Sequence, residues 1–355
     1  MRNLPAQLLT AISVGRHFSA KAEYHGKAEQ ILIISRPPSS TIEIYLRPRL
    51  VNSPVPVHIV SLPGKPLDIE YFSKPTFVII SRYINSAWCV ALRKHHKQIT
   101  GIAYLMDDDI PEAGYDRTLP SGYSFGLALF FYRYWKQLQK LCSELWVSSP
   151  YLLEKYSSAV THLIEPMFVA NPRIGKDTNN VTLFYHAQRT HYLDIIWLRP
   201  IIHEIQKRFN HTIFETFGGF TIERAYASVP RARVIKRFGW NKYLEYCSRL
   251  DYDIGLAPLY GGGEFNKARS INKLFDISRC GAAGIYSNID PYKGVIENGK
   301  TGFLCHNDPE VWIDTISMLI ENERLRKSIY NNCYEYCIDH NIRAVTPENL
   351  KKLMR

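Results

Sequence analysis

The sequence predicts an α/β protein made of two doubly wound, Rossmann-like domains with a cleft between them. Short apolar runs alternate with stretches of helical periodicity, as expected for parallel sheets covered by helices. A segment with the Pro, Gly and Asn content of a linker interrupts the pattern at 165–180, and the pattern then starts again. The length of 355 residues suits two domains of roughly 150 residues each.

The first half of the chain supplies the elements of one domain. Apolar runs predict buried strands at 31–35, 57–62, 77–81, 99–106 and 145–148. Helical periodicity predicts helices over 86–97 and 127–142. Ser149 and Pro150 indicate the start of a further helix, because serine caps helix N-termini and proline suits the first turn.

The second half repeats this organisation. Strands are predicted at 181–185, 212–217, 234–238, 254–258 and 284–287. Helices are predicted at 194–209, 242–249, 270–279, 309–322 and 323–337, and a short last helix begins around Pro347. We therefore expect an N-terminal domain over 1–168, a C-terminal domain over 180–335, and a final segment, 336–355, that packs back on the N-terminal domain.

The net charge of +11 and the isoelectric point of about 9.2 favour a negatively charged partner. Lys and Arg are spread along the chain without a basic run, and no nucleic-acid-binding motif is present. We therefore expect no nucleic-acid partner. Phosphate-bearing substrates and an anionic membrane surface remain as candidates.

The seven cysteines are scattered, and no two of them are separated by two residues. This spacing predicts no metal site, and it is typical of buried thiols in a reducing compartment. No apolar run reaches the roughly 20 residues that span a bilayer. We therefore expect a cytoplasmic protein, with peripheral attachment to the cytoplasmic membrane face as an extension. Because the first acidic residue is Glu23, an ordinary helix and a basic targeting segment both fit the N-terminus.

Candidate ligand-binding residues are densest in the segment 253–281. Glycines occupy 261–263 after a predicted strand, and a helix is expected to start near Ser270. Gly-rich loops and helix N-termini present backbone N–H groups to anions. Lys267 and Lys273 add positive charge beside them. Two interpretations stay open, a cradle for a diphosphate and a solvated surface loop.

This segment resembles the donor site of GT-B glycosyltransferases of the family-4-like, or group 1, type. The residues that carry the resemblance are the strand 253–259, Phe265, Asn266, Ser270, Lys273, Asp276 and Gly281. The similarity covers most of 180–330 and is weak over 1–165. It implies a GT-B fold in which the C-terminal domain binds a nucleotide-sugar donor and the N-terminal domain binds the acceptor.

The resemblance also implies roles for single residues. Arg189 and Lys273 would contact the diphosphate, and Asp276 would accept hydrogen bonds from the ribose. His191 would contact the sugar or the acceptor, although a capping or packing role fits one histidine equally well. Further donor-binding candidates are Asn266, Lys267, Arg269 and Ser270. Cations at the diphosphate make a metal ion and a cofactor unnecessary, so the expected ligands are a nucleotide sugar and a glycan or lipid-linked acceptor.

One position departs from the family pattern. Many retaining members carry two glutamates eight positions apart here; Asp276 fits the second, whereas Ala268 occupies the place of the first. Glu264 is the candidate substitute, from a shifted position. Because this carboxylate is missing, a second interpretation stays open, in which the chain is a non-catalytic protein that only binds a nucleotide sugar.

Three aspartates, Asp107, Asp108 and Asp109, follow the strand predicted at 99–106. They fit a turn or helix cap, an acceptor-site carboxylate in a GT-B cleft, with Asp109 as the catalytic candidate, or a metal site like that of GT-A transferases. The second α/β unit argues against the GT-A alternative.

The stretch 124–135 combines six aromatic residues with Arg133, and Lys136 follows it. Such a segment fits a membrane interface and a core helix equally. A basic, peripheral enzyme acting on a lipid-linked acceptor would explain both this stretch and the net charge.

Overall fold

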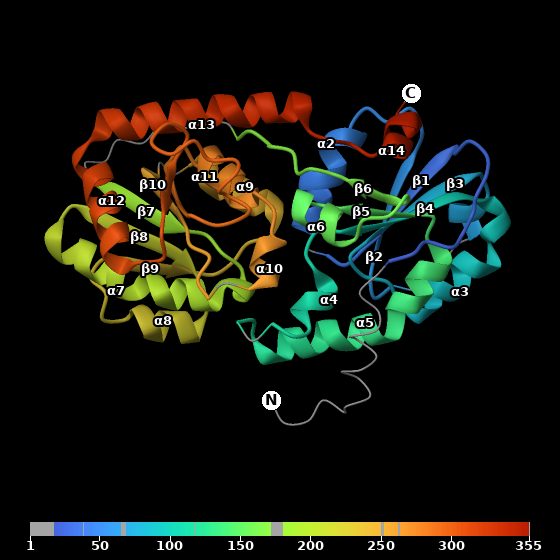
Figure 1. Cartoon of the computed structure of the whole chain (residues 1–355), viewed down its shortest axis with the longest axis horizontal. Helices are drawn as coiled ribbons and strands as arrows, with labels where there is room; N and C mark the ends of the chain where they lie inside the picture. The colour runs from blue at the N-terminus through green and yellow to red at the C-terminus, as the bar shows by residue number, and fades with distance from the viewer. Residues whose placement is uncertain are drawn as a thin grey trace.

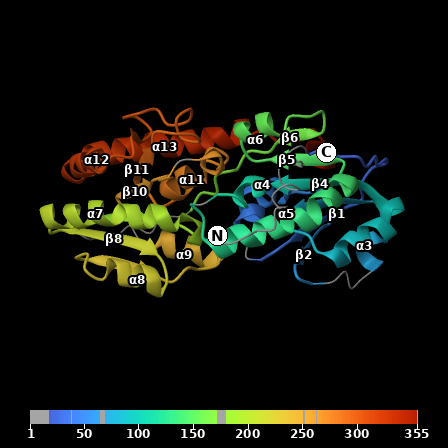
Figure 2. The ribbon, with the colours of Figure 1, turned by 60° about the horizontal axis from the view of Figure 1, so that its bottom comes forward.

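The computed structural model describes residues 18–37, 39–64, 69–116, 118–171, 180–249, 252–261 and 263–354, with the backbone alone at 69, 70 and 189. Two parallel six-stranded sheets, each flanked by helices, form two domains that lie side by side (Figures 1 and 2). This confirms the predicted α/β class with two Rossmann-like domains. The targeting segment considered at the N-terminus falls largely outside the described residues.

The first sheet has the order β2-β1-β3-β4-β5-β6. Its strands are β1 (Gln30–Ser35), β2 (Val57–Ser61), β3 (Thr76–Ser81), β4 (Ile99–Met106), β5 (Glu144–Val147) and β6 (Thr161–Leu163). β1 and β3 are buried along their whole length, which explains their uninterrupted apolar sequences. Successive side chains of β1 enter opposite layers, since Leu32 and Ile34 pack in one core cluster and Ile31 and Ile33 in another.

The second sheet has the order β12-β11-β10-β7-β8-β9. Its strands are β7 (Val181–Tyr185), β8 (Thr212–Phe217), β9 (Ala232–Ile235), β10 (Ile254–Ala257), β11 (Ala283–Ser287) and β12 (Phe303–Cys305). Leu183 faces the layer of α7 (Tyr192–Arg208) and α12 (Pro309–Glu321), whereas Phe184 faces the layer of α9 (Trp240–Ser248) and α11 (Asn272–Arg279).

Helices of the first domain fill the connections between its strands. They are η1 (Ile42–Leu46), α2 (Arg47–Leu50), η2 (Ile69–Phe72), α3 (Ser86–Lys94), η3 (His96–Gln98), α4 (Ile110–Ala113), α5 (Ser121–Leu141) and α6 (Pro150–Lys155). Asn85 caps α3 and Ser149 caps α6 through side-chain oxygens that accept backbone N–H bonds.

The second domain contains η4 (Arg189–His191), α7 (Tyr192–Arg208), α8 (Phe220–Tyr226), α9 (Trp240–Ser248), α10 (Glu264–Lys267), α11 (Asn272–Arg279), α12 (Pro309–Glu321) and α13 (Glu323–Arg343). α13 runs from this domain toward the first, where α14 (Glu348–Leu353) lies (Figure 1). Leu350 of α14 is fully buried in the core of the first domain.

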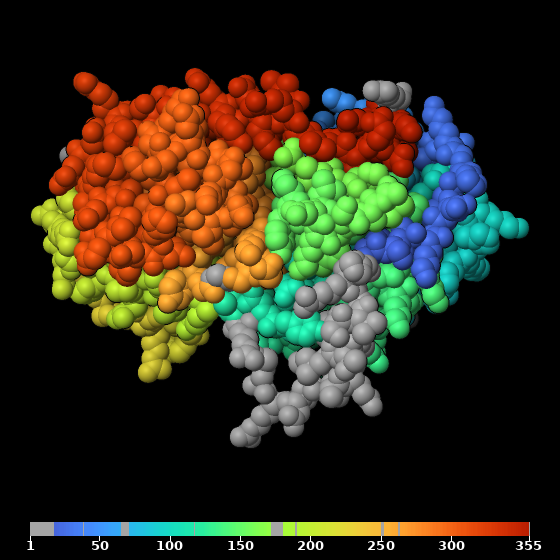
Figure 3. Space-filling model, viewed as in Figure 1, coloured from blue at the N-terminus to red at the C-terminus, as the bar shows by residue number. Residues whose placement is uncertain are grey.

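The helix predicted to begin near Ser270 starts two residues later, and a short helix that was not predicted precedes it. The chain forms the short helix α10, turns, and starts α11 at Asn272. The reason is tertiary: Phe265 and Ala268 are buried in the core of the first domain, so α10 packs across the domain boundary. Figure 3 shows the two domains in contact along this seam.

Candidate active site

A cavity of about 660 Å³ lies between the domains, at the carboxyl ends of both sheets. Ligands of open α/β sheets bind at this edge. The first domain contributes Ser40, Ile44, Arg82, Asp107 and Asp108 to its walls. The second domain contributes most of the remaining lining, including His186, Gln188, Thr190, His191, Arg237, Tyr243, Arg269, Ser270, Asn272, Lys273, Asp276 and Tyr292.

Lys273 and Asp276 lie on the first turns of α11 and form an ion pair across 2.9 Å. The Lys273 ammonium also donates to the backbone oxygen of His186, 2.6 Å away, which ties α11 to the end of β7. Burial raises the pKa of Asp276, but the charges of Lys273 and Arg279 outweigh burial and hold it below its ordinary value. The wall of the second domain therefore presents a fixed cation beside an ionised carboxylate.

Arg269 and His191 form a second polar pair in this wall. Because a guanidinium only donates, His191 Nε2 accepts from Arg269 Nη1, 3.0 Å away. The Nδ1–H of His191 then donates to Asp194 at 2.7 Å. The other oxygen of Asp194 accepts from the backbone N–H of Tyr260 at 2.7 Å. The chain of bonds fixes the position of the Arg269 guanidinium.

His191 is neutral at physiological pH. Burial and the positive charge of Arg269 lower the pKa of its imidazole to about 4, although Asp194 acts in the opposite direction. Both ring nitrogens have partners, so the geometry favours His191 as the residue that positions Arg269.

The wall of the first domain centres on Arg82, which directly follows β3. Its guanidinium pairs with Asp107 at 3.1 Å and with Asp108 at 2.8 Å. Arg82 has a backbone φ of 62°, in the left-handed region that non-glycine residues seldom adopt and that recurs at functional sites. The Tyr104 hydroxyl donates to the Arg82 backbone oxygen and supports this conformation.

Asp107 is a carboxylate with an altered proton affinity. Burial raises its pKa, the neighbouring charge of Arg82 lowers it, Asp108 raises it, and the net pKa is above the ordinary value. Thr41 donates a hydrogen bond of 2.6 Å to its second oxygen. A buried carboxylate with a raised pKa at a cavity wall is suited to accept a proton.

The structure places Asp109 outside the cavity, with no exposed surface. One of its oxygens caps α4 and accepts from the Tyr156 hydroxyl at 2.7 Å, and the other pairs with Lys155 at 2.7 Å. Asp109 thus stabilises the first domain, and its neighbours Asp107 and Asp108 are the aspartates that reach the cavity. Asp107 and Asp108 share Arg82 as a partner, whereas Asp109 turns to Lys155 and Tyr156, so the three carboxylates do not converge on one point.

The glycine loop and α10 face the first domain instead of the cavity. Glu264 is about half exposed, pairs with Lys267 at 2.7 Å and accepts a hydrogen bond from Tyr151 of the first domain. A side chain at Gly261 would contact Thr118. Of the segment predicted to bind a diphosphate, only the part from Arg269 onward therefore faces the cavity.

The remaining predicted donor residues divide into two groups. Ser270 lines the cavity, whereas Asn266 lies behind it and accepts from Arg269 Nε at 3.1 Å. The side chain of Arg189 lies outside the described residues. Ala268 is fully buried, so the position of the missing carboxylate serves domain packing.

Sequence reasoning missed several residues of the cavity, chiefly Arg82, Arg237, Asn272 and Tyr292. A signal existed for Arg82, because it follows an apolar strand directly, as Asp107 does. The other three become neighbours of the site only through tertiary packing.

Two doubly wound parallel sheets that face each other across a cavity define the GT-B fold of glycosyltransferases, as the resemblance implied. The structure is similar to that of sucrose-phosphate synthase from Thermosynechococcus elongatus, with a TM-score of 0.63 and 11% identity over 88% of this chain and 94% of that one. It is also similar to Anabaena Alr3699/HepE in complex with UDP and glucose, with a TM-score of 0.59 and 10% identity over 88% and 97% of the two chains.

A mutant of S. aureus TarM, crystallised with fondaparinux, alpha-GlcNAc-glycerol and UDP, gives a TM-score of 0.55 and 12% identity. The match covers 78% of this chain, which spans only 54% of the TarM chain. No protein-family model matches the sequence, and no curated protein matches it. The similarity lies in the fold, at identities too low to transfer a substrate.

Proposed function

We propose that this chain is a glycosyltransferase that moves a sugar from a nucleoside-diphosphate sugar to a hydroxyl of a glycan or lipid-linked acceptor. The observation that carries the proposal is the interdomain cavity, in which Arg269 and Lys273 face Asp107 and Asp108. Nucleotide sugars carry two phosphates, and several proteins of similar fold were crystallised with UDP. The excess of positive charge suits such a donor.

On the donor side, Lys273 and Arg269 bind the diphosphate, and the Asp276 carboxylate accepts hydrogen bonds from ribose hydroxyls. When the bond between the sugar and the diphosphate breaks, negative charge grows on the leaving phosphate. Fixed cations that already face this position stabilise the transition state more than the ground state. In this proposal they take the part that a divalent metal plays in GT-A enzymes.

On the acceptor side, Asp107 accepts the proton of the attacking hydroxyl. The acceptor oxygen forms a bond to the anomeric carbon, the bond from that carbon to the diphosphate oxygen breaks, and the nucleoside diphosphate leaves. Arg82 holds Asp107 in place through its ion pair. The raised pKa of Asp107 makes it a better proton acceptor than an ordinary surface aspartate.

A thermal-shift screen of nucleotides and nucleotide sugars tests the donor side, because a ligand that binds the native state raises the melting temperature. The stabilising donor is then incubated with acceptor pools, and release of nucleoside diphosphate is measured with and without Mg²⁺ or Mn²⁺. Turnover without added metal supports the proposal. A strict requirement for either ion would overturn the metal-independent part, and stabilisation by no nucleotide would overturn the proposal as a whole.

The alternative of a non-catalytic nucleotide-sugar binding protein has one observation in its favour. Ala268 is buried where many retaining family members carry a carboxylate. This alternative predicts tight binding of a nucleotide sugar with neither hydrolysis nor transfer, which the same screen would detect.

We further propose that the first domain docks on an anionic membrane surface through α5. Phe125, Leu129 and Tyr132 are exposed on this helix at positions that share one face. Arg133, Lys136 and Lys140 are exposed beside them, and the helix contains no acidic residue. Among the described helices, none is long and apolar enough to cross a membrane. The arrangement instead suits a helix that lies in the interface.

A further inference from the structure

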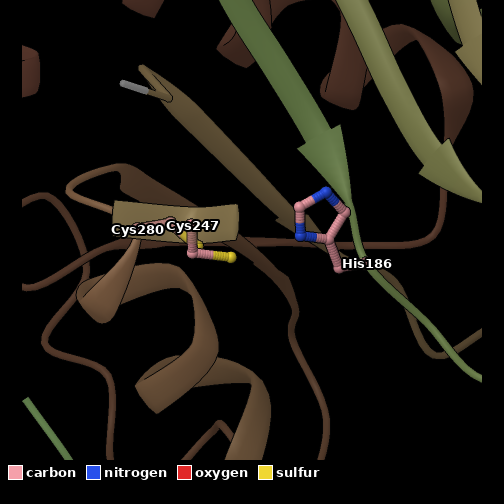
Figure 4. A group of neighbouring side chains, drawn as sticks. All are labelled: His186, Cys247 and Cys280. Atoms are coloured by element: carbon pink, nitrogen blue, oxygen red, sulfur yellow. The ribbon is translucent and has the colours of Figure 1, made fainter. Parts of the chain in front are cut away.

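Three side chains that are far apart in the sequence meet behind the cavity: His186, Cys247 and Cys280. One nitrogen of His186 and the two sulfur atoms all lie within 4.8 Å of one another. All three residues are buried. Figure 4 shows the imidazole of His186 turned toward Cys247, which lies in α9, and Cys280, which directly follows α11.

A buried carboxylate orients the imidazole from the other side. His186 Nε2 lies 3.1 Å from an oxygen of Glu215 and donates its hydrogen to it. The hydroxyls of Tyr246 and Tyr252 also donate to Glu215, which holds this carboxylate in place. With Nε2 protonated, Nδ1 keeps its lone pair for the side of the cysteines. A carboxylate behind a histidine in this way is typical of metal sites.

We infer that His186, Cys247 and Cys280 form a zinc site that pins α9 and α11 to the end of β7. Zinc binds thiolate sulfur at about 2.3 Å and imidazole nitrogen at about 2.0 Å. The ligand atoms of one tetrahedral ion would lie about 3.5–4 Å apart, which is inside the 4.8 Å that bounds this group. The Tyr243 hydroxyl lies 3.5 Å from Nδ1, at the edge of this group.

The net charge of the buried site favours Zn²⁺ over other soft metal cations. Two thiolates and one Zn²⁺ sum to zero, which suits a site with almost no exposure to water. A monovalent soft ion such as Cu⁺ would leave a net negative charge near Asp276, which lies one helical turn before Cys280. The expectation of no metal site rested on local cysteine spacing, which cannot detect ligands that only the fold brings together.

The site has a consequence for the cavity, although the inference does not rest on the proposed function. His186 and Tyr243 line the cavity, and the His186 backbone oxygen accepts from Lys273. An ion bound to His186 therefore fixes the strand end that holds the Lys273 ammonium.

The test measures zinc in the full-length protein, expressed with zinc supplementation and purified without a metal-affinity tag, by inductively coupled plasma mass spectrometry. Wild type should contain about one zinc ion per chain, and Cys247→Ser and Cys280→Ser should contain less than about 0.2. Cys142→Ser is the matched control, because Cys142 is also fully buried but belongs to the first domain. It should retain about one ion.

A second measurement covers variants that fold poorly. Wild type stripped of metal should regain melting temperature when Zn²⁺ is added, and Co²⁺ should produce a thiolate-to-metal charge-transfer band. Wild type that neither contains nor binds zinc would overturn the inference. A disulfide between Cys247 and Cys280 in the untreated protein, seen by peptide mapping, would also overturn it in favour of a redox pair.

Discussion

Arg269 donates a hydrogen bond to Nε2 of His191 across 3.0 Å, and this contact fixes both the tautomer of the imidazole and the direction of the guanidinium. The imidazole in turn is held by Asp194, which also binds the backbone of Tyr260. A histidine with two satisfied nitrogens supports its neighbour, and in the proposed function the Arg269 guanidinium is the group that contacts the ligand.

Substitution of Arg269 separates these two roles. We expect Arg269→Ala to lower kcat/KM by on the order of 10²-fold, because a fixed cation at the developing charge is lost. His191→Ala should lower it by a smaller factor of about 10, since the guanidinium remains but its orientation is no longer fixed. Steady-state kinetics check both. Equal losses, or a larger loss for His191→Ala, would contradict the assignment of His191 as a positioning residue.

Lys273 and Lys267 provide a matched pair for donor binding. Lys273 lines the cavity, whereas Lys267 is half exposed on α10 and pairs with Glu264. We expect Lys273→Ala to weaken nucleoside-diphosphate binding by about 10- to 100-fold, the worth of a hydrogen bond to a charged group. Lys267→Ala should bind like wild type. Isothermal titration calorimetry measures both, and a reversed order would refute the location of the diphosphate.

Asp107 and Asp109 are two residues apart but should give opposite results. Asp107→Asn should lower kcat by about 10²- to 10⁴-fold, because the amide cannot accept the proton. Its loss of stability should be the smaller of the two, because Arg82 keeps Asp108 as a charged partner. Asp109→Asn should cost about 1–3 kcal/mol of stability, since Lys155 and Tyr156 lose a charged acceptor. Its activity per folded molecule should remain. Denaturation and kinetics on the same preparations distinguish the two.

The low pKa of His191 predicts a pH dependence of stability. Its pKa is about 4 in the native state and 6.5 ordinarily. Above 6.5 the imidazole is neutral in both states and the free energy of unfolding is unaffected. As the pH falls from 6.5 toward 4, the unfolded chain takes up a proton that the native state refuses, so stability is lost at about 1.4 kcal/mol per pH unit.

His191→Asn removes this contribution while other titrating groups stay in place. Urea unfolding at about pH 7.5 and about pH 5 should therefore show a smaller loss for the variant than for wild type. Lys273 and Arg269 act on His191 in the same direction as burial, and Asp194 opposes them. An equal pH dependence in both proteins would mean that His191 is protonated normally in the native state.

The exposed face of α5 predicts binding to anionic vesicles. Replacing Phe125, Leu129 and Tyr132 together with serine should abolish flotation with phosphatidylglycerol vesicles, because the apolar anchor is removed. Wild type should float with these vesicles and lose binding at high salt. Phe220→Ser in the second domain is the control, since Phe220 is the more exposed at 78% and lies far from α5 in sequence. If wild type floated with neutral vesicles and not with anionic ones, the expected attraction between the basic residues of α5 and anionic lipid would be wrong.

Strands were the most predictable part of this fold. β4, β7 and β8 match the predicted ranges because both faces are buried, which leaves a continuous apolar sequence with sharp ends. β9 was placed two residues too late and β6 was not predicted, since edge strands are short and partly exposed. α5 begins at Ser121, earlier than predicted, because the glycines of its first turns obscure the helical pattern.

The site was predictable in its chemistry and less so in its geometry. Arg269, Lys273 and Asp276 were singled out by type and spacing, and all three line the cavity. Nothing local distinguishes Asp109 from Asp107, since the choice between cap and cavity depends on which side of β4 the chain turns. In the same way, the glycine loop has the composition of a phosphate cradle, but its direction is set by the packing of Phe265 on the first domain.

The chain crosses between the domains twice at one edge of the molecule, near 165–168 and again near 341–345. The crossings are bonded to each other: Glu165 N–H donates to the Val345 oxygen at 3.1 Å, and Asn341 exchanges two hydrogen bonds with the Phe168 backbone. Bending of the two domains about the line of these paired crossings would keep the hydrogen bonds between them. Twisting or sliding of one domain against the other would break those bonds. The bonded crossings therefore oppose sliding and twisting of one cavity wall past the other, which preserves the relative register of Asp107 and Lys273.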